Sequence, residues 1–344
     1  MIEIDQPDDW HVHLRDGPML GRVAGETARQ FGRAIVMPNL DPPVQTTDQA
    51  VAYRDRILAS LPKGSSFQPL MTLYLTAETT PSEIQRAASS GVVFGVKLYP
   101  KGATTNAESG VDRLDEMAPL LEAMEQHEMP LLIHGESTDP ECDVFDREEV
   151  FLNEWLAPTV ERHAGLRVVF EHITTKSAVD YVRQAPKRVG ATLTPQHLLL
   201  NRNALFAGGL RPHHYCLPVL KRERDREALL AAATSGDPHF FLGTDSAPHS
   251  RSSKESACGC AGIYSAPIAL ELYAQAFASV DALDRLEGFA SHFGADFYGL
   301  PRHQKKRQLR PSTWTVPDSS SPDLDTPQVF WAGQDLDYRL VDEV

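Results

Sequence analysis

Short apolar runs alternate along this chain with longer segments whose apolar residues recur at helical spacing. Eight runs predict buried strands, at residues 10–14, 34–37, 70–75, 94–98, 131–134, 167–171, 191–194 and 240–243. The segments between them predict helices, among them residues 47–60, 81–90, 111–127, 147–163 and 176–184. Strands that alternate with helices form parallel sheets, and eight such units predict a closed (β/α)8 TIM barrel.

A doubly wound open sheet is the alternative arrangement of the same elements. Nucleotide-binding sheets of that kind carry a glycine-rich phosphate loop, either G-x-G-x-x-G after the first strand or G-x-x-x-x-G-K-[ST]. Neither pattern occurs at those places in the sequence. The barrel is therefore the preferred prediction.

The 344 residues are 42% hydrophobic and 23% charged, which is typical of a folded globular chain. We expect residues 1–344 to form a single catalytic barrel domain. The composition changes near the C-terminus, where a basic stretch, 302–310, precedes a segment rich in Ser, Pro, Asp and Thr, 311–327. We expect residues 302–344 to form an arm that packs on the barrel, anchored by the apolar residues 329–332.

The net charge of −14 argues against a nucleic-acid partner, because phosphates are neutralised by a basic excess. A small anionic substrate stays compatible with it, since a few local Arg and His side chains can override the overall field. The sequence has no run of about 18 apolar residues and no signal-peptide pattern, so we expect a cytoplasmic protein without a membrane partner. Cys258 and Cys260 have no second pair nearby and are interpreted as free thiols.

Candidate catalytic residues gather at the ends of the predicted strands. His11 and His13 alternate along the first strand, so both imidazoles point to one face, and Arg15 continues the alternation. Further polar residues lie at the ends of later strands: Lys97 on the fourth, His134 on the fifth, His172 on the sixth and Asp245 on the eighth. In a barrel these ends meet at one face, where active sites lie. Imidazole and carboxylate groups brought together there predict a metal centre.

Taken singly, each of these residues has an ordinary structural explanation. A histidine at a strand end is commonly a hydrogen-bonded rim residue, and Asp245 after Gly-Thr suits a turn or a helix cap. Lys97 is harder to explain, because burying an unpaired ammonium is costly. A neutral lysine amine that takes up carbon dioxide becomes an anionic carbamate, which can bridge two cations roughly 3.5–4 Å apart. We therefore expect Lys97 to be carboxylated.

The order of these ligands resembles the amidohydrolase superfamily: two histidines on strand one, lysine on strand four, histidines on strands five and six, and aspartate on strand eight. Local motifs extend the likeness: PDDWHVHLRDG at 7–17, MPNL at 37–40, KLYP at 97–100, FEHITTK at 170–176 and GTDSAPH at 243–249. From about residue 5 to residue 300, the chain resembles the shorter, stand-alone class of bacterial dihydroorotases. That resemblance implies reversible cyclisation of N-carbamoyl-L-aspartate to L-dihydroorotate in pyrimidine (UMP) biosynthesis.

The resemblance also implies a cofactor of two Zn²⁺ per subunit. The ligands that it implies are His11, His13 and Asp245 for one ion, and His134 and His172 for the other. Carboxylated Lys97 (N6-carboxylysine) and a hydroxide would bridge the two ions. Asp245 would be the catalytic residue that moves the proton between the hydroxide and the ring nitrogen.

For the substrate, the resemblance implies a carboxylate-binding group made of Arg15, Asn39 and His249. It also implies that two metal ligands, His13 and His134, contact the substrate. Backbone groups near Leu217 and Ala261 would hold the ring amide. A mobile loop at 101–110, carrying Thr104 and Thr105, would close over the substrate, although without the resemblance it is an ordinary surface loop. The family also implies a homodimer.

Two other functions remain open at this point. Another cyclic amidohydrolase, such as a hydantoinase or dihydropyrimidinase, would share the metal site. Arg15, Asn39 and His249 favour a substrate that carries a carboxylate, which the ring substrates of those enzymes need not have. A non-catalytic scaffold on the same barrel would have little reason to keep all six metal-site residues.

Overall fold

The computed structural model describes residues 1–111, 114–318 and 323–341. Eight parallel strands form one sheet in the order of the chain: β2 (Asp9–Val12), β3 (Arg33–Val36), β4 (Gln68–Tyr74), β5 (Val93–Leu98), β6 (Leu131–Ile133), β7 (Val168–Phe170), β8 (Val189–Leu193) and β9 (Phe240–Leu242). Each corresponds to one predicted strand. The predicted TIM barrel is confirmed.

The barrel closes between its first strand and the segment that follows its last. The backbone N–H of Asp245 donates to the carbonyl of His11 at 2.9 Å, and the N–H of His13 donates to Ser246 at 3.0 Å. The buried Asp9 carboxylate adds two bonds to this seam, from the N–H and the hydroxyl of Thr244 at 2.8 and 2.6 Å. These bonds bring residues far apart in the sequence to one edge.

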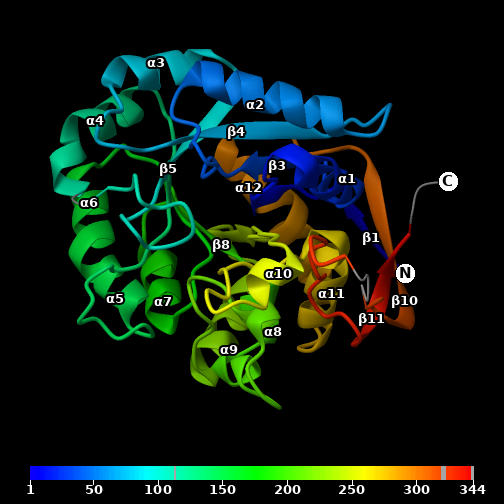
Figure 1. Cartoon of the computed structure of the whole chain (residues 1–344). Helices are drawn as coiled ribbons and strands as arrows, with labels where there is room; N and C mark the ends of the chain where they lie inside the picture. Colours follow the sequence, from blue (N-terminus) through cyan, green and yellow to red (C-terminus); the bar gives the residue numbers. More distant parts are fainter. Residues whose placement is uncertain (112–113, 319–322, 342–344) are drawn as a thin grey trace.

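Helices α1 to α9 lie in the connections between barrel strands, and α10 to α12 follow the last barrel strand (Figure 1): α1 (Leu20–Gln30), α2 (Thr47–Ser60), α3 (Pro81–Ser89), α4 (Ala118–Gln126), α5 (Arg147–Phe151), α6 (Ala157–Arg162), α7 (Lys176–Gln184), α8 (Pro195–Leu199), α9 (Glu223–Ala233), α10 (Arg251–Lys254), α11 (Ala269–Ala278) and α12 (Phe293–Tyr298). Helices α2 and α7 have their predicted bounds. The helix predicted over 147–163 is α5 and α6 joined by a π-helical turn. Within the helix predicted over 111–127, residues 112–113 lie outside the described residues. Among the described residues, no helix has the length and apolar content needed to cross a membrane.

One end of the barrel is filled by apolar side chains. Trp10 stacks on Tyr298 of α12 with ring centroids 4.6 Å apart, and α12 approaches so closely that a Cβ at Gly294 would lie 2.0 Å from the Trp10 ring. Leu132 and Phe241 belong to the same buried cluster. This end is the N-terminal end of the strands, so polar chemistry is left to the opposite, C-terminal end.

A second, antiparallel sheet joins the two ends of the chain. It consists of β1 (Ile2–Asp5), β10 (Lys306–Thr315) and β11 (Asp335–Leu340), with Ile2 opposite Leu309 and Leu309 opposite Leu340. Figure 1 shows it at the side of the barrel, with β11 beside α11. The arm predicted over 302–344 thus supplies two strands, and its segment 311–327 begins as part of β10. Residues 319–322 and 342–344 of that arm lie outside the described residues.

Candidate active site

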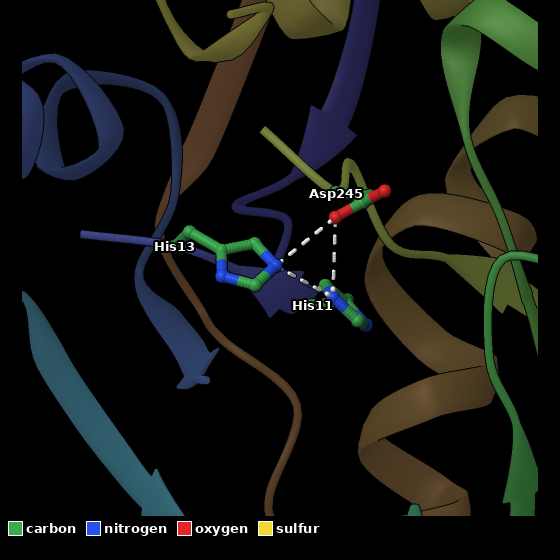
Figure 2. A group of neighbouring side chains, drawn as sticks. All are labelled: His11, His13 and Asp245. Carbon is green, nitrogen blue, oxygen red and sulfur yellow. Dashed lines mark hydrogen bonds and ion pairs between the residues drawn. The ribbon is translucent and has the colours of Figure 1, made fainter. Parts of the chain in front are cut away.

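Three predicted ligands converge at the barrel seam. The Nε2 atoms of His11 and His13 lie 3.3 Å apart, and each lies near Oδ1 of Asp245, at 3.3 and 3.2 Å (Figure 2). All three side chains are buried. The structure therefore brings together residues 11, 13 and 245, as the strand-end pattern predicted.

The spacing of these three atoms suits one metal ion. Ligand atoms about 2.0–2.1 Å from a tetrahedral zinc ion lie roughly 3.3–3.4 Å from one another. The three observed separations are 3.2–3.3 Å. Two imidazoles and one carboxylate are also a donor set that zinc accepts. The geometry and the chemistry of this group both fit a divalent cation.

Unusual backbone conformations aim several of these side chains. Arg15, His172 and Asp245 have φ of +58°, +41° and +46°, in the left-handed region that residues other than glycine rarely adopt. Along an extended strand, consecutive side chains point to opposite faces. A left-handed residue at the strand end interrupts that alternation. Such conformations cost about 1–3 kcal/mol each and concentrate at functional sites.

Lys97 lies beneath this group, and its side chain has no exposed surface. Its Nζ donates to Oε2 of Glu171, which is equally buried. The other oxygen of Glu171 lies 3.0 Å from Nδ1 of His11. Ligand atoms of His11, Glu171 and His172 all lie within 4.8 Å of one another. The structure thus joins Lys97 to the first metal group through a residue that we did not predict.

His134 and His172 form the second pair of predicted ligands. Their ring centroids are 4.8 Å apart, and His172 is 4.9 Å from the ring of His11. Nε2 of His134 lies 2.8 Å from a carboxylate oxygen of the buried Glu136, so Nδ1 is the nitrogen left for a metal. Nδ1 of His172 is buried and has no hydrogen-bond partner among the described residues. These two histidines could hold a second cation beside the first.

Burial and neighbouring charges shift several pKa values in the metal-free chain. Burial lowers the pKa of His11, but the carboxylates of Glu171 and Asp245 outweigh it and raise that pKa to about 9. A metal ion must therefore displace a proton from His11. Burial lowers the pKa of His13 to about 4. It also lowers the pKa of Lys97, against the attraction of Glu171, which favours the neutral amine that can react with carbon dioxide.

A pocket at the C-terminal end of the strands contains most of the predicted site. It is lined by all predicted site residues except Lys97 and His249: His11, His13, Arg15, Asn39, Thr104, Thr105, His134, His172, Leu217, Asp245 and Ala261. Lys97 is completely buried and does not line the pocket. His249 lies behind Arg15 and Ala261, with Nε2 3.0 Å from an Nη2 of Arg15 and 3.0 Å from the carbonyl of Ala261.

The predicted carboxylate-binding residues are close to one another. Burial and the neighbouring Arg15 lower the pKa of His249 to about 3, so its imidazole is neutral. A neutral Nε2 can donate to Ala261 or accept from Arg15, but it cannot do both. The Arg15 guanidinium also donates from Nε to the carbonyl of Pro248 at 2.9 Å. Arg15 is therefore held in place beside the metal group, with a positive charge facing the pocket.

The predicted lid loop lies over the pocket. The Asn39 side-chain amide donates to the carbonyl of Thr105 at 3.1 Å, and the amide of Asn106 donates back to the carbonyl of Asn39 at 3.1 Å. The hydroxyl of Tyr74 donates to the carbonyl of Asn106 at 3.3 Å. Because Asn39 is also a predicted carboxylate-binding residue, the loop and the substrate would share one side chain.

Sequence reasoning missed several residues of this site. Tyr99 lines the pocket and lies two residues after Lys97, so the strand period could have revealed it. Glu136 likewise lies two residues after His134, whereas Glu171 had no such signal. Glu171 immediately precedes His172 and should face away from it on a regular strand, but the left-handed His172 lets both side chains point inward.

Comparison with known proteins places these features in a family. The amidohydrolase family model matches residues 8–303. A dihydroorotase from Alkalilimnicola ehrlichii is 60% identical over 99% of both chains, and one from Ralstonia nicotianae is 63% identical over 92% of both.

Solved structures agree with this assignment. A dihydroorotase from Saccharomyces cerevisiae, in complex with 5-fluoroorotic acid, matches 100% of this chain and 99% of its own with a TM-score of 0.90 and 34% identity. An L-hydantoinase (dihydropyrimidinase) from Arthrobacter aurescens matches 99% of this chain and 83% of its own with a TM-score of 0.82. At 16% identity, the hydantoinase shares the fold alone.

Proposed function

The chain belongs to the amidohydrolase family and, within it, to the dihydroorotases, and from this membership we propose that it catalyses the reversible cyclisation of N-carbamoyl-L-aspartate to L-dihydroorotate. This reaction makes or breaks a cyclic amide C–N bond. The observation that carries the proposal is one pocket that contains both the candidate metal ligands and the candidate carboxylate-binding residues.

A two-cation centre suits the residues at the bottom of the pocket. We assign one Zn²⁺ to His11, His13 and Asp245 and the other to His134 and His172, shared through carboxylated Lys97. Bound divalent ions would lower the pKa of water towards 7 and polarise the amide carbonyl. The 3.2–3.3 Å spacing of the first ligand group and the buried position of Lys97 support this assignment.

Asp245 is the catalytic residue in this proposal. Its Oδ1 lies next to both first-strand histidines at the pocket floor. In ring opening, the carboxylate accepts the proton of the attacking water and delivers it to the leaving ring nitrogen. In cyclisation it takes the proton from the ureido nitrogen and returns it to the departing oxygen. A carboxylate held at a fixed position can serve both directions.

The carboxylate that does not react would be held by Arg15, Asn39 and His249. Arg15 supplies charge and a planar pair of N–H donors, and Asn39 supplies an amide donor. The energy gained by binding this carboxylate would hold the ring carbonyl over the metal ligands. It would thereby reduce the entropy lost on the way to the transition state. Backbone groups near Leu217 and Ala261 would hold the ring amide.

Closure of the 101–110 loop would exclude water during the reaction. Thr104 and Thr105 would donate their hydroxyls to the ligand, and the bond from Asn39 to Thr105 supports a lid at this position. We further propose that residues 1–344 act as one catalytic unit and form a homodimer, as the family resemblance implies. Sedimentation of the purified chain at several concentrations would test the dimer.

The test of the function is turnover of L-dihydroorotate by zinc-loaded protein, followed by ultraviolet absorbance, together with zinc stoichiometry. Dihydrouracil is the matched control substrate, because it has the same ring without the carboxylate. We expect two zinc ions per chain and turnover of dihydroorotate only. Protein that holds zinc but turns over dihydrouracil and not dihydroorotate would contradict the substrate assignment.

A further inference from the structure

Glu171 lies between two candidate metal ligands and has no role in the function described so far. Its side chain is completely buried and does not line the pocket. One carboxylate oxygen receives Lys97 Nζ, and the other lies 3.0 Å from Nδ1 of His11. A single carboxylate therefore contacts a histidine ligand and the lysine that would bridge the metal ions.

The contact with His11 is on the side of the ring away from the metal group. Nε2 faces His13 and Asp245, and Nδ1 faces Glu171. In this structure the ring and the carboxylate are close but not aligned for a hydrogen bond, and neither atom has another partner among the described residues. A carboxylate that accepts the Nδ1 proton leaves the Nε2 lone pair free for a cation and fixes the ring orientation.

The contact with Lys97 has a similar consequence after carboxylation. When the neutral amine adds to carbon dioxide, an N–C bond forms, one proton leaves to solvent, and one N–H remains on Nζ. That N–H can donate to the same oxygen of Glu171 that Lys97 Nζ contacts in the unmodified chain. Because the carbamate is planar at nitrogen, a fixed N–H also fixes the plane of the new carboxylate.

We propose that Glu171 is a positioning residue that orients both His11 and carboxylated Lys97, so that one buried carboxylate sets the geometry shared by the two metal sites. The proposal rests on the metal centre of the proposed function and adds a residue to it. Glu136 has a related contact, but among the described residues that contact is with His134. Glu171 is distinct because its two oxygens connect ligands from two different strands.

The test replaces the carboxylate while keeping its shape. Glu171→Gln keeps one acceptor oxygen but replaces the other by an amide nitrogen that cannot accept, so it can accept from only one of the two partners. Glu171→Asp keeps the charge but is shorter, and Glu271→Gln is the matched control at a buried carboxylate that does not line the pocket. Zinc affinity of the metal-free proteins is measured by competition with a chromophoric chelator. Carboxylation is measured from the carbamate signal in ¹³C NMR after exposure to ¹³C-bicarbonate.

For Glu171→Gln we expect zinc affinity to fall about 10–100-fold and the carbamate signal to weaken, because one of the two ligands loses its acceptor. Glu171→Asp should recover part of both, and Glu271→Gln should match the wild type. Folded Glu171→Gln with wild-type zinc affinity and carbamate signal would overturn the proposal.

If the variants fail to fold, a measurement on the zinc-loaded wild type still tests the proposal. Its ¹⁵N spectrum should show His11 protonated at Nδ1, and an Nδ1 without a proton would overturn the proposal. Wild type that binds zinc and is carboxylated but does not turn over dihydroorotate would refute the proposed function and leave the role of Glu171 standing. Wild type that binds no zinc would overturn both.

Discussion

His197 is a buried histidine whose protonation should destabilise the fold in mild acid. It is 2% exposed and lies just beyond β8. Its Nδ1 accepts from the hydroxyl of Thr194 at 2.7 Å, and its Nε2 donates to the carbonyl of Pro218 at 3.0 Å. Both ring nitrogens are thus used by the neutral imidazole. The bond to Pro218 ties the end of β8 to the segment that carries Leu217.

The size of the effect follows from the pKa of His197, which burial lowers to about 4. In the unfolded chain the pKa of histidine is about 6.5. Because the folded-state pKa is the lower one, the stability that neutral His197 contributes is complete above pH 6.5 and is lost as the pH falls towards 4. At pH 5 this loss amounts to about 2 kcal/mol, since each pH unit below 6.5 costs about 1.4 kcal/mol.

The assay compares urea unfolding of the wild type and His197→Phe, both metal-free, at pH 7.5 and pH 5. At pH 7.5 the variant should be less stable by about 1–3 kcal/mol, because the buried Thr194 hydroxyl and Pro218 carbonyl lose the imidazole to which they bond. Cys216 also donates to the carbonyl of Pro218, at 3.4 Å, which favours the lower part of that range. The variant lacks the titrating group, so the difference should shrink by about 2 kcal/mol at pH 5.

Comparing the two proteins removes the contribution of the other histidines, which titrate in both. Unchanged urea m-values would show that the two proteins expose the same surface on unfolding. A stability difference that stays constant between pH 7.5 and pH 5 would refute the reasoning, because it would mean that His197 titrates alike in the folded and unfolded chains.

Arg33→Ala should lower the free energy of unfolding by about 3 kcal/mol, because the buried Asp8 loses the guanidinium that pairs with it at 2.6 Å and keeps only His303, at 2.8 Å, among its described charged partners; a urea midpoint close to that of the wild type would contradict this. Lys97→Ala should lose bound zinc and activity together, and a variant with full zinc content and full turnover would exclude the bridging carbamate. Replacing Thr104 and Thr105 together by Ala should lower kcat on dihydroorotate while zinc content stays at the wild-type value, and loss of zinc would show a role other than that of a lid.

Local patterns were enough to predict the barrel. The barrel strands are short, mostly apolar runs, and α2 follows its N-cap residue Thr46, which forms a capping box with Gln49. The sheet of β1, β10 and β11 could not be predicted in the same way, because its pairings join residues at opposite ends of the chain. Within β10 the proline at position 311 also removes a strand signal, and the pairing shifts register between Pro311 and Trp314.

The residues of the candidate site could likewise be predicted only in part. His11, His13 and Asp245 could be predicted because chemistry-bearing residues at strand ends converge in a barrel. Glu171 could not be predicted, because its side chain points inward beside a left-handed His172, and no residue pattern predicts that backbone conformation. The bond between Asn39 and the lid loop likewise depends on how two distant loops meet.

The pairing of Ile2 with Leu309 sets an order of events during synthesis of the chain. At 5–20 residues per second, the ribosome needs roughly 15–60 s to make the 300 or so residues that separate the two partners. During that time β1 lacks β10, the strand with which it pairs, and an unpaired strand edge favours association with other chains. Nascent protein should therefore depend on chaperone protection at its N-terminus until the final strands have been made.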